Sequence, residues 1–520
     1  MNTGTSQKSL DLFFDDPRIP KKWNPGIEMV TTKMMKVPRS KLRRQSWIEQ
    51  WPECIALTFY IILIAWAIAH HEPWADEAQA WQLARNVPLL ELFRHSLRYE
   101  GHPGLWYIVI ACLSKLRVDY RGLHWFCGVI GAISAALLMF RSPFPRYVRL
   151  SLPFTFFLAF QYVVVARSYV LAPLLLFCLA LAWRRSILLA ALLLGLLANV
   201  SMHCLAISAG FVLVYAMELR RGISVATRRQ IYKAAAITGT LCLLAIVTVA
   251  PHPKDIVLPF QVGIPVSIQR FLAPVRMLVS LCQGVIQPGI LAIPLWLLIL
   301  RQFKRTKLLL YLLPTATLAL LCGYVFTFWH AGLIVPTAIT ICWIAWPQIT
   351  RTTQGWRPIL IYIALVIVVQ EAWTVRAVYH HRYSPDIETA RFLAPYVEAG
   401  DTMAVTYVKR DDVNAFHSVG LYPYFDHPLF INEPRPYWLW STHEHTFNEF
   451  DRAMDSHPEL VVAMYFDIYH RFNPSKDLTG PRVARIQKDG YRLTNTFCAE
   501  KPEGFRDREE TCFLIFQRPK

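Results

Sequence analysis

The chain has 520 residues, of which 54% are hydrophobic and only 17% charged, and its formal net charge is +18. So few charges in so long and hydrophobic a chain are typical of a membrane protein with many spans. The basic residues are dispersed among apolar runs, a distribution that serves membrane topology and contact with anionic lipid heads, so no nucleic-acid partner is expected.

Charge divides the chain into three regions. Residues 1–50 hold ten Lys/Arg and five Asp/Glu, and we expect this basic N-terminal arm to be cytoplasmic because positive segments stay on that side. Residues 51–377 are predicted to form the transmembrane module. Residues 378–520 hold 17 Lys/Arg and 21 Asp/Glu, and they are predicted to form an extracytoplasmic soluble domain.

Apolar runs of membrane length recur from Ile55 to Val375. This pattern predicts a polytopic α-helical membrane protein with about 11–13 transmembrane helices. The candidate spans are residues 54–70, 104–116, 122–140, 150–166, 170–183, 186–205, 205–219, 233–250, 275–300, 307–329, 331–347 and 358–377.

The first apolar run is followed by an acidic loop, residues 70–103, which the topology places on the outer face. The loop holds five of the ten carboxylates between Glu53 and Glu371. A charge beside hydrocarbon is costly, so such a concentration suggests a reaction site at the membrane surface. Pro73 and Pro88 are expected to bound one short amphipathic helix and a second should follow it, both lying flat on the membrane.

Asp76 and Glu77 are neighbours in the first turn of that predicted helix. Successive side chains of a helix point about 100° apart, so one should face a cavity and the other water or a basic partner. Helix capping is the alternative explanation for both. The pair could hold Mg²⁺ or Mn²⁺, but no third oxygen ligand is evident and no metal is required.

Other polar residues interrupt the apolar runs or lie at their ends: Glu100, His102, Arg167, Tyr169, His203 and His330. An arginine or histidine here could bind an anion, since both donate hydrogen bonds to phosphate. Each also has a plainer explanation. His102 can hold a helix end, Arg167 can extend to the membrane surface, and His203 and His330 can join helices by hydrogen bonds.

The tail has the pattern of a small α/β domain. A helix is predicted over residues 386–398, with strands over 402–408, 460–466 and 511–517. Cys498 and Cys512 flank a polar stretch, and two strand-like apolar pieces bracket a predicted turn there. They should form a disulfide if the tail lies in an oxidising compartment, and not otherwise.

The order of these features resembles the GT-C glycosyltransferase superfamily, which includes protein mannosyltransferases and bacterial aminoarabinose transferases. In these enzymes an acidic residue of the first outer loop acts at the acceptor, and Asp76 matches that position, with Glu77 beside it. A K-P-P-L or H-P-P-L motif at the start of the next span lies near the carrier phosphate. His102, Pro103 and Leu105 match it, and Gly104 replaces its second proline. The stretch from Val165 to Tyr169 resembles the arginine-bearing end of a later span.

The resemblance implies transfer of a sugar from a polyprenyl-phosphate donor to a lipid, glycan or protein acceptor on the extracytoplasmic face. A lipid phosphate is already a good leaving group, so a single carboxylate base suffices, which favours inverting displacement. We expect Asp76 to be that base. The site residues expected are Asp76 and Glu77 for catalysis, His102, Arg167 and Tyr169 for the donor phosphate, and Glu100, Trp81, His203 and His330 for the substrate cavity.

Three other classes remain open. A multispan transporter should show an internal repeat, and none is evident. A non-catalytic scaffold would tolerate Asp76→Asn, and a ligase of whole glycans would need a larger late outer loop than residues 251–274. Membrane lipids are partners in every case. The compact loops favour a bacterial inner membrane, with an endoplasmic reticulum left open.

Overall fold

The computed structural model describes residues 50–250, 266–325, 327–349, 356–379, 382–408, 416–433, 435–439, 449–467, 471–503 and 507–519. The predicted basic arm lies outside these ranges except for its last residue. The chain divides into two compact units, Met1–Pro52 and Glu53–Lys520. The fold and the sites below belong to the second unit.

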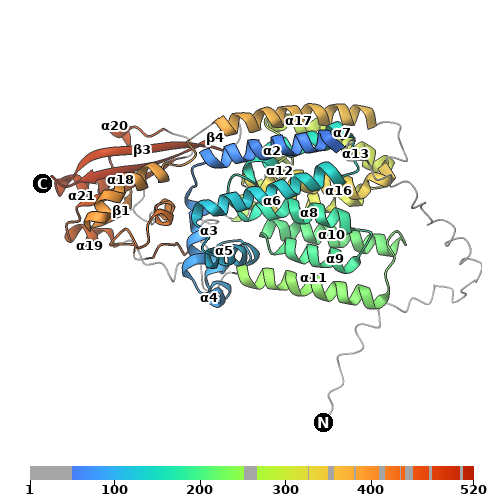
Figure 1. Ribbon diagram of the computed structural model, residues 1–520, viewed down its shortest axis with the longest axis horizontal. Helices are drawn as coiled ribbons and strands as arrows, with labels where there is room; N and C mark the ends of the chain where they lie inside the picture. Colours follow the sequence, from blue (N-terminus) through green and yellow to red (C-terminus); the bar gives the residue numbers. More distant parts are fainter. Residues whose placement is uncertain are drawn as a thin grey trace, which may run out of the picture. The chain divides into compact units, whose positions relative to one another are not determined.

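Within the described residues, six helices are long and apolar enough to cross a membrane (Figure 1). They are α2 (Trp51–His70), α6 (Tyr120–Arg141), α10 (Met202–Arg220), α11 (Arg228–Val249), α15 and α16 (Phe328–Ala331 and Ile334–Ile349) taken together, and α17 (Trp356–Tyr379). The prediction of a mostly helical protein with membrane-length apolar helices is therefore confirmed. The number of such helices among the described residues is six, whereas 11–13 spans were expected.

Shorter helices account for part of the difference. Four of them are strongly apolar: α5 (Leu105–Lys115), α8 (Leu171–Ala182), α9 (Ile187–Ala198) and α14 (Leu313–Tyr324). The expected span 275–300 is instead split between α12 (Val266–Gln283) and α13 (Ala292–Arg305). Gly284 lies at this break, and a Cβ there would meet the carbonyl oxygen of Ala331 at 2.2 Å.

The expected span 150–166 is not one helix. It is divided into α7 (Arg146–Ser151), the 3₁₀ turn η6 (Leu152–Phe154) and the π-helical turn η7 (Phe157–Gln161). Pro153 lacks the amide hydrogen that a continuous helix needs at that point. The chain then runs without a helix to the 3₁₀ turn η8 (Ser168–Val170), and this irregular stretch carries Arg167.

The acidic loop folds into α3 (Ala75–Asn86), α4 (Leu89–Arg94) and the 3₁₀ turn η5 (Ser96–Tyr99). The two short helices were predicted, but the expectation that α3 is amphipathic, with one face open to water, is wrong. Residues 77–84 of α3 are all buried, because α5 on one side and the tail turns η12 (Phe416–Gly420) and η13 (Tyr422–Tyr424) pack on it.

The tail contains a four-stranded sheet with the order β1-β2-β4-β3. The strands are β1 (Met403–Tyr407), β2 (Leu460–Asp467), β3 (Arg492–Glu503) and β4 (Asp507–Gln517). β1 and β2 are parallel and the other pairs antiparallel. The helices are α18 (Asp386–Ala399), α19 (Phe450–Asp455), α20 (Pro474–Asp477) and α21 (Pro481–Lys488). The predicted helix and three strands correspond to α18, β1, β2 and β4, and the strand-like piece predicted at Cys498 falls within β3.

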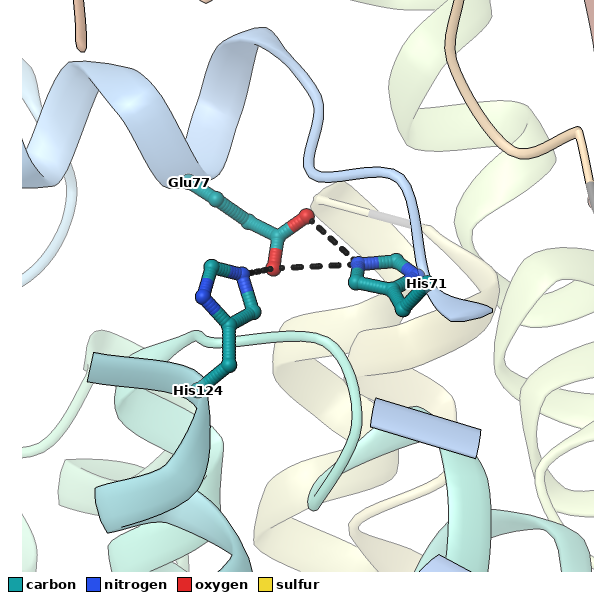
Figure 2. Close-up of side chains that lie close together, drawn as sticks. All are labelled: His71, Glu77 and His124. Atoms are coloured by element: carbon teal, nitrogen blue, oxygen red, sulfur yellow. Dashed lines mark hydrogen bonds and ion pairs between the residues drawn. The ribbon is translucent and has the colours of Figure 1, made fainter. Parts of the chain in front are cut away.

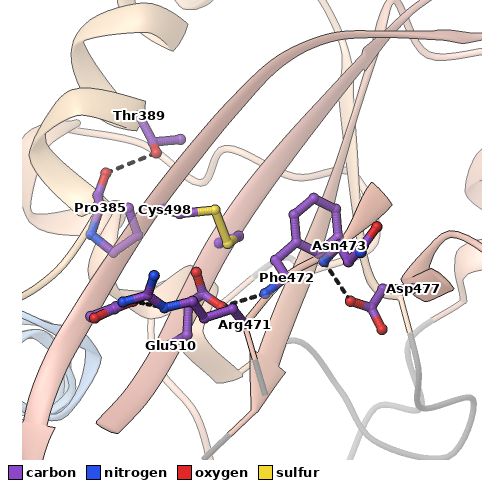
Figure 3. The surroundings of a disulfide bond; sticks show 10 residues. Pro385, Thr389, Arg471, Phe472, Asn473, Asp477, Cys498 and Glu510 are labelled. Atoms are coloured by element: carbon purple, nitrogen blue, oxygen red, sulfur yellow. Dashed lines mark hydrogen bonds and ion pairs between the residues drawn. A yellow bond between two sulfur atoms is a disulfide. The ribbon is translucent and has the colours of Figure 1, made fainter. Parts of the chain in front are cut away.

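Cys498 and Cys512 are directly paired residues of β3 and β4 and form a disulfide (Figure 3). The conditional prediction of this bond is met in the structure. Two further contacts lie near the disulfide: the backbone nitrogen of Phe472 donates to the Glu510 side chain, and Arg471 forms an ion pair of 2.6 Å with Glu500 (Figure 3).

Candidate functional site

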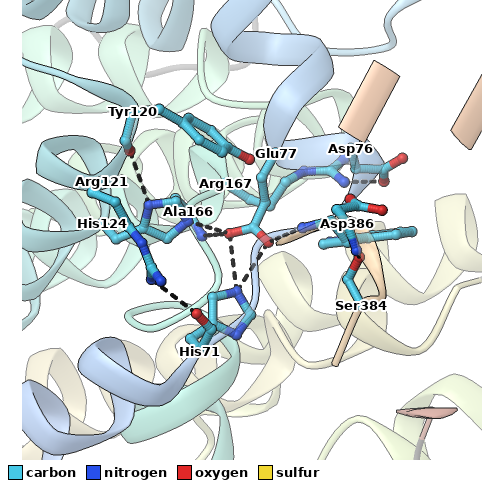
Figure 4. Close-up of polar contacts among 11 residues, drawn as sticks. His71, Asp76, Glu77, Tyr120, Arg121, His124, Ala166, Arg167, Ser384 and Asp386 are labelled. Atoms are coloured by element: carbon cyan, nitrogen blue, oxygen red, sulfur yellow. Dashed lines mark hydrogen bonds and ion pairs between the residues drawn. The ribbon is translucent and has the colours of Figure 1, made fainter. Parts of the chain in front are cut away.

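Asp76 and Arg167 form an ion pair between the acidic loop and the irregular stretch before η8 (Figure 4). The two residues are 91 positions apart in the sequence. Their side chains are 22% and 15% exposed respectively, so the pair is largely but not completely buried. The structure thus brings together a carboxylate and a guanidinium that sequence analysis selected separately.

Glu77 points to different partners from those of its neighbour. One of its carboxylate oxygens, Oε1, accepts a hydrogen bond from the backbone N–H of Trp74 at 3.1 Å. The other, Oε2, accepts one from the backbone N–H of Ala166 at 2.5 Å. The first bond caps α3, as the capping alternative anticipated, and the second ties α3 to the residue just before Arg167. The Glu77 carboxylate therefore links the two chain segments that carry Asp76 and Arg167.

Two imidazoles face the same carboxylate (Figure 2). The Nε2 atoms of His71 and His124 each lie 3.0 Å from a Glu77 oxygen. All three side chains are buried, and that of Glu77 is completely so. Burial alone would raise the pKa of the Glu77 carboxyl, but His71, His124 and their hydrogen bonds hold that pKa below its ordinary value. Glu77 is therefore a carboxylate, while burial lowers the pKa of His71 against the opposing effect of that carboxylate.

Glu100 lies close enough to the Asp76–Arg167 pair to interact with both charges. Its carboxylate accepts hydrogen bonds from the Gln79 amide at 2.7 Å and the Tyr107 hydroxyl at 3.2 Å. Burial raises the pKa of Glu100 to about 7, and the charge of Asp76 adds to the effect against the opposing hydrogen bonds. A carboxyl with such a pKa exchanges its proton near neutral pH, as acid–base groups of enzymes do.

Gln79 connects this carboxyl to the tail. Besides Glu100, its Nε2 donates to the backbone oxygen of Trp438 at 2.7 Å, and its Oε1 accepts from the backbone nitrogen of Trp438 at 2.9 Å. The Gln79 amide thus pairs with both backbone groups of Trp438, as a neighbouring strand would. It joins this part of the tail to the Glu100 carboxyl.

His102, Tyr169 and His330 form a hydrogen-bonded chain. The Tyr169 hydroxyl lies 2.8 Å from Nε2 of His102 and 2.6 Å from Nε2 of His330. A carbonyl oxygen can only accept, so Nδ1 of His102, 2.8 Å from the Glu100 carbonyl, carries the proton. Burial, and then Arg167, lower the pKa of His102 to about 3, so the ring is neutral and Nε2 accepts from Tyr169.

The direction of the remaining bonds follows from that assignment. The Tyr169 hydroxyl donates its hydrogen to His102, so its oxygen accepts from Nε2 of His330. Nδ1 of His330 then accepts from the Thr327 hydroxyl at 2.5 Å. The imidazole of His203 stacks on His330 with ring centroids 3.8 Å apart. These residues were expected to contact the donor phosphate or the cavity. In the structure their imidazole nitrogens bond to the Tyr169 and Thr327 hydroxyls and to backbone carbonyls.

Trp81, expected in the cavity, is 3% exposed, and its ring lies 5.9 Å from that of Tyr120. Sequence analysis missed four of the residues that organise the site: His71, Gln79, Tyr107 and His124. A weak signal existed for His124, which stands alone among apolar residues of α6 and faces inward. His71 could not be distinguished from His70, since only the fold makes one buried and the other exposed.

The Asp76 and Glu77 side chains bond to separate partners, so in this arrangement they do not share a ligand position for Mg²⁺ or Mn²⁺. The chain matches no known protein-family model and no curated protein sequence. The proposals below therefore rest on the residues and their geometry, together with the motif resemblance.

Proposed function

We propose that this protein is a membrane glycosyltransferase of GT-C type, which moves a sugar from a polyprenyl-phosphate donor to a lipid, glycan or protein acceptor. The observation that carries the proposal is the sheltered Asp76–Arg167 pair, held in place by Glu77 and bordered by Glu100. It offers one carboxylate and one permanent cation at the end of apolar helices, which are the two charges that displacement of a sugar from a lipid phosphate requires.

The chemistry divides between the two members of the pair. Asp76 takes the proton of the acceptor hydroxyl while the acceptor oxygen forms its bond to C1 of the sugar. The bond between C1 and the phosphate oxygen breaks at the same time, and the polyprenyl phosphate leaves with the bonding electrons. Attack and departure on opposite faces invert the configuration at C1.

Arg167 stabilises the departing phosphate. A guanidinium binds phosphate through two parallel hydrogen bonds and keeps its charge in a sheltered site. Without substrate it neutralises Asp76; with the donor phosphate present its hydrogen bonds are divided between the two anions, which frees Asp76 to accept a proton. The planar group also lies near the Tyr169 ring, 5.9 Å from its centroid, so the His102–Tyr169–His330 chain supports Arg167 from one side.

Glu100 has a second role in this scheme. Its pKa of about 7 suits it to receive the proton from Asp76 and return it to water. No metal ion enters these steps. We place the reaction, the acidic loop and the tail on the extracytoplasmic face, and favour a bacterial inner membrane. The disulfide of the tail supports this placement, because such bonds persist in oxidising compartments.

The test uses the purified full chain in detergent with labelled hexosyl and pentosyl polyprenyl phosphates, and bacterial membranes as acceptor. Release of polyprenyl phosphate and incorporation of label are both measured. Asp76→Asn should lower transfer on the order of 10²–10⁴-fold. Glu91→Gln, which alters an exposed carboxylate of α4, should not. Equal activity of wild type and Asp76→Asn would show that the pair is only structural.

The same preparation tests the alternatives. A transporter reconstituted in vesicles would accumulate intact donor or sugar without releasing polyprenyl phosphate, and a scaffold would do neither. Cysteine labelling of the exposed positions Asn86 and Ser475 in intact cells should place both outside. Reaction of Ser475→Cys only after the membrane is opened would move the tail to the cytoplasm and remove it from the proposed site.

A further inference from the structure

A second site lies on the other side of α3. His71 follows α2, Glu77 belongs to α3 and His124 belongs to α6, so three elements each contribute one side chain that can bind a metal ion. One ligand atom from each residue lies within 4.8 Å of the other two, and all three residues are buried (Figure 2). The Asp76–Arg167 chemistry uses neither imidazole.

Both ring nitrogens of His124 face oxygen atoms that accept hydrogen bonds. Its Nδ1 lies 3.1 Å from the carbonyl oxygen of Tyr120, and a carbonyl only accepts, so Nδ1 carries the hydrogen. In a neutral ring Nε2 then presents a lone pair to Glu77 Oε2 at 3.0 Å. Two acceptors at that distance repel one another unless the ring takes a second proton or a cation lies between them. A backbone carbonyl that fixes the far nitrogen is also the usual support of a metal-binding histidine.

Unpartnered oxygens around the cluster provide an independent observation. The hydroxyls of Tyr120 and Tyr424 and the Oδ2 atom of Asp386 are buried and have no hydrogen-bond partner among the described residues. Tyr120 packs edge-on against His124, and Tyr424 packs against Tyr120. Asp386 is close enough to Glu77 for their charges to interact. Buried oxygens without partners are rare in proteins and commonly indicate an absent ion or water.

We propose that His71, Glu77 and His124 bind a divalent transition-metal ion, with Zn²⁺ the best fit. Two imidazoles and one carboxylate are a frequent donor set for zinc, whereas Mg²⁺ and Ca²⁺ prefer oxygen ligands. Tetrahedral zinc holds such ligand atoms about 3.4 Å apart, so the observed cluster needs to contract by no more than about 1.4 Å.

The ion has a structural consequence for the neighbouring pair. Glu77 follows Asp76 directly in the chain, and Ala166, whose N–H bonds to Glu77, directly precedes Arg167. A metal ion bound to Glu77 would therefore help to fix the two backbone segments that carry Asp76 and Arg167, and so would position that ion pair. The inference rests on the cluster and does not depend on sugar transfer.

The experiment measures metal in the full chain, purified in detergent with its affinity tag removed. Protein stripped with a chelator is reloaded with Zn²⁺, passed over a desalting column and assayed by elemental analysis. Wild type and His70→Gln, which alters the exposed neighbouring histidine, should each retain about one zinc ion per chain. His71→Gln and His124→Gln should retain less than about a tenth of that amount, because a site with two ligands binds zinc far more weakly.

Cobalt loading decides the matter even where a variant fails to fold. Co²⁺ in the wild-type site should give the strong visible bands of a four- or five-coordinate ion with nitrogen ligands, and Zn²⁺ should abolish them by competition. A folded wild type that retains no zinc, or retains it equally in His71→Gln, overturns the proposal. A cobalt spectrum like that of the ion in water does the same, and the cluster is then an imidazolium–carboxylate pair.

Discussion

Replacing Glu77 with glutamine should destabilise the protein far more than its small chemical change suggests. Each carboxylate oxygen accepts one backbone hydrogen bond, from Trp74 on one side and from Ala166 on the other. Glutamine has only one oxygen. Whichever way its amide is turned, a buried N–H group therefore faces an NH₂ group.

The magnitude follows from those two contacts. A buried donor left without an acceptor costs about 1–3 kcal/mol, and the surviving bond loses the part of its strength that came from the negative charge. We expect Glu77→Gln to lower the free energy of unfolding by about 2–5 kcal/mol. Loss of a metal ion at His71 and His124 would add to this figure.

Equilibrium unfolding in mixed detergent micelles measures the loss, with a thiol-reactive dye reporting exposure of the buried Cys127 and Cys204. Glu91→Gln makes the same chemical change at an exposed position of α4 and should stay within about 0.5 kcal/mol of wild type. If Glu77→Gln were equally harmless, the carboxylate would not be tying α3 to Ala166, and the account of how Asp76 meets Arg167 would fail.

Three further predictions concern other contacts. The pKa of Glu100 is about 7 against an ordinary 4.5, so between these values the folded protein keeps a proton that the unfolded chain has released. The free energy of unfolding should therefore fall on the order of 2–3 kcal/mol as pH rises from 4.5 to 7. Glu100→Gln should reduce this pH dependence in melting curves recorded at pH 5 and 8. Tyr169→Phe should leave Nε2 of His102 and of His330 without partners, lower stability by about 1–3 kcal/mol and lower sugar transfer, whereas an unchanged melting temperature would contradict the hydrogen-bond chain. Reduction of Cys498–Cys512 should raise the number of reactive thiols by two and weaken the tail by about 3 kcal/mol, given its short loop, as limited proteolysis before and after reduction would reveal.

The sequence was sufficient for the parts of the fold that follow from apolar runs and local pattern. Membrane-length helices such as α2 and α6 lie where the apolar runs are, and α18, β1, β2 and β4 follow local periodicity. The strand-like piece predicted at Cys498 covers only part of β3, because the sequence of this strand, RLTNTFCAEKPE, is polar at most positions. The strand lies at the edge of the sheet and pairs only with β4, and edge strands commonly carry charged side chains.

Residues brought together by tertiary contacts could not be predicted in the same way. The stretch from 150 to 166 is apolar enough for a span, but Pro153 and the bond between Ala166 and Glu77 impose an irregular path. The acidic pair and Arg167 were selected from the sequence, whereas the partners of Glu77 were not. Nothing local to His71 or His124 indicates that both reach the same carboxylate from distant parts of the chain.

The Gln79 amide has a consequence for how the protein can be handled. Its three hydrogen bonds join α3 to Glu100 and to the backbone of Trp438, and residues 53–520 form one compact unit. The change in composition near residue 378 therefore does not mark a place where the gene can be cut into independently expressed halves. A polypeptide ending there would keep Gln79 but lose both backbone groups that it binds. Supplying residues 378–520 as a second polypeptide should restore the fold only as a split protein, through reassembly on α3.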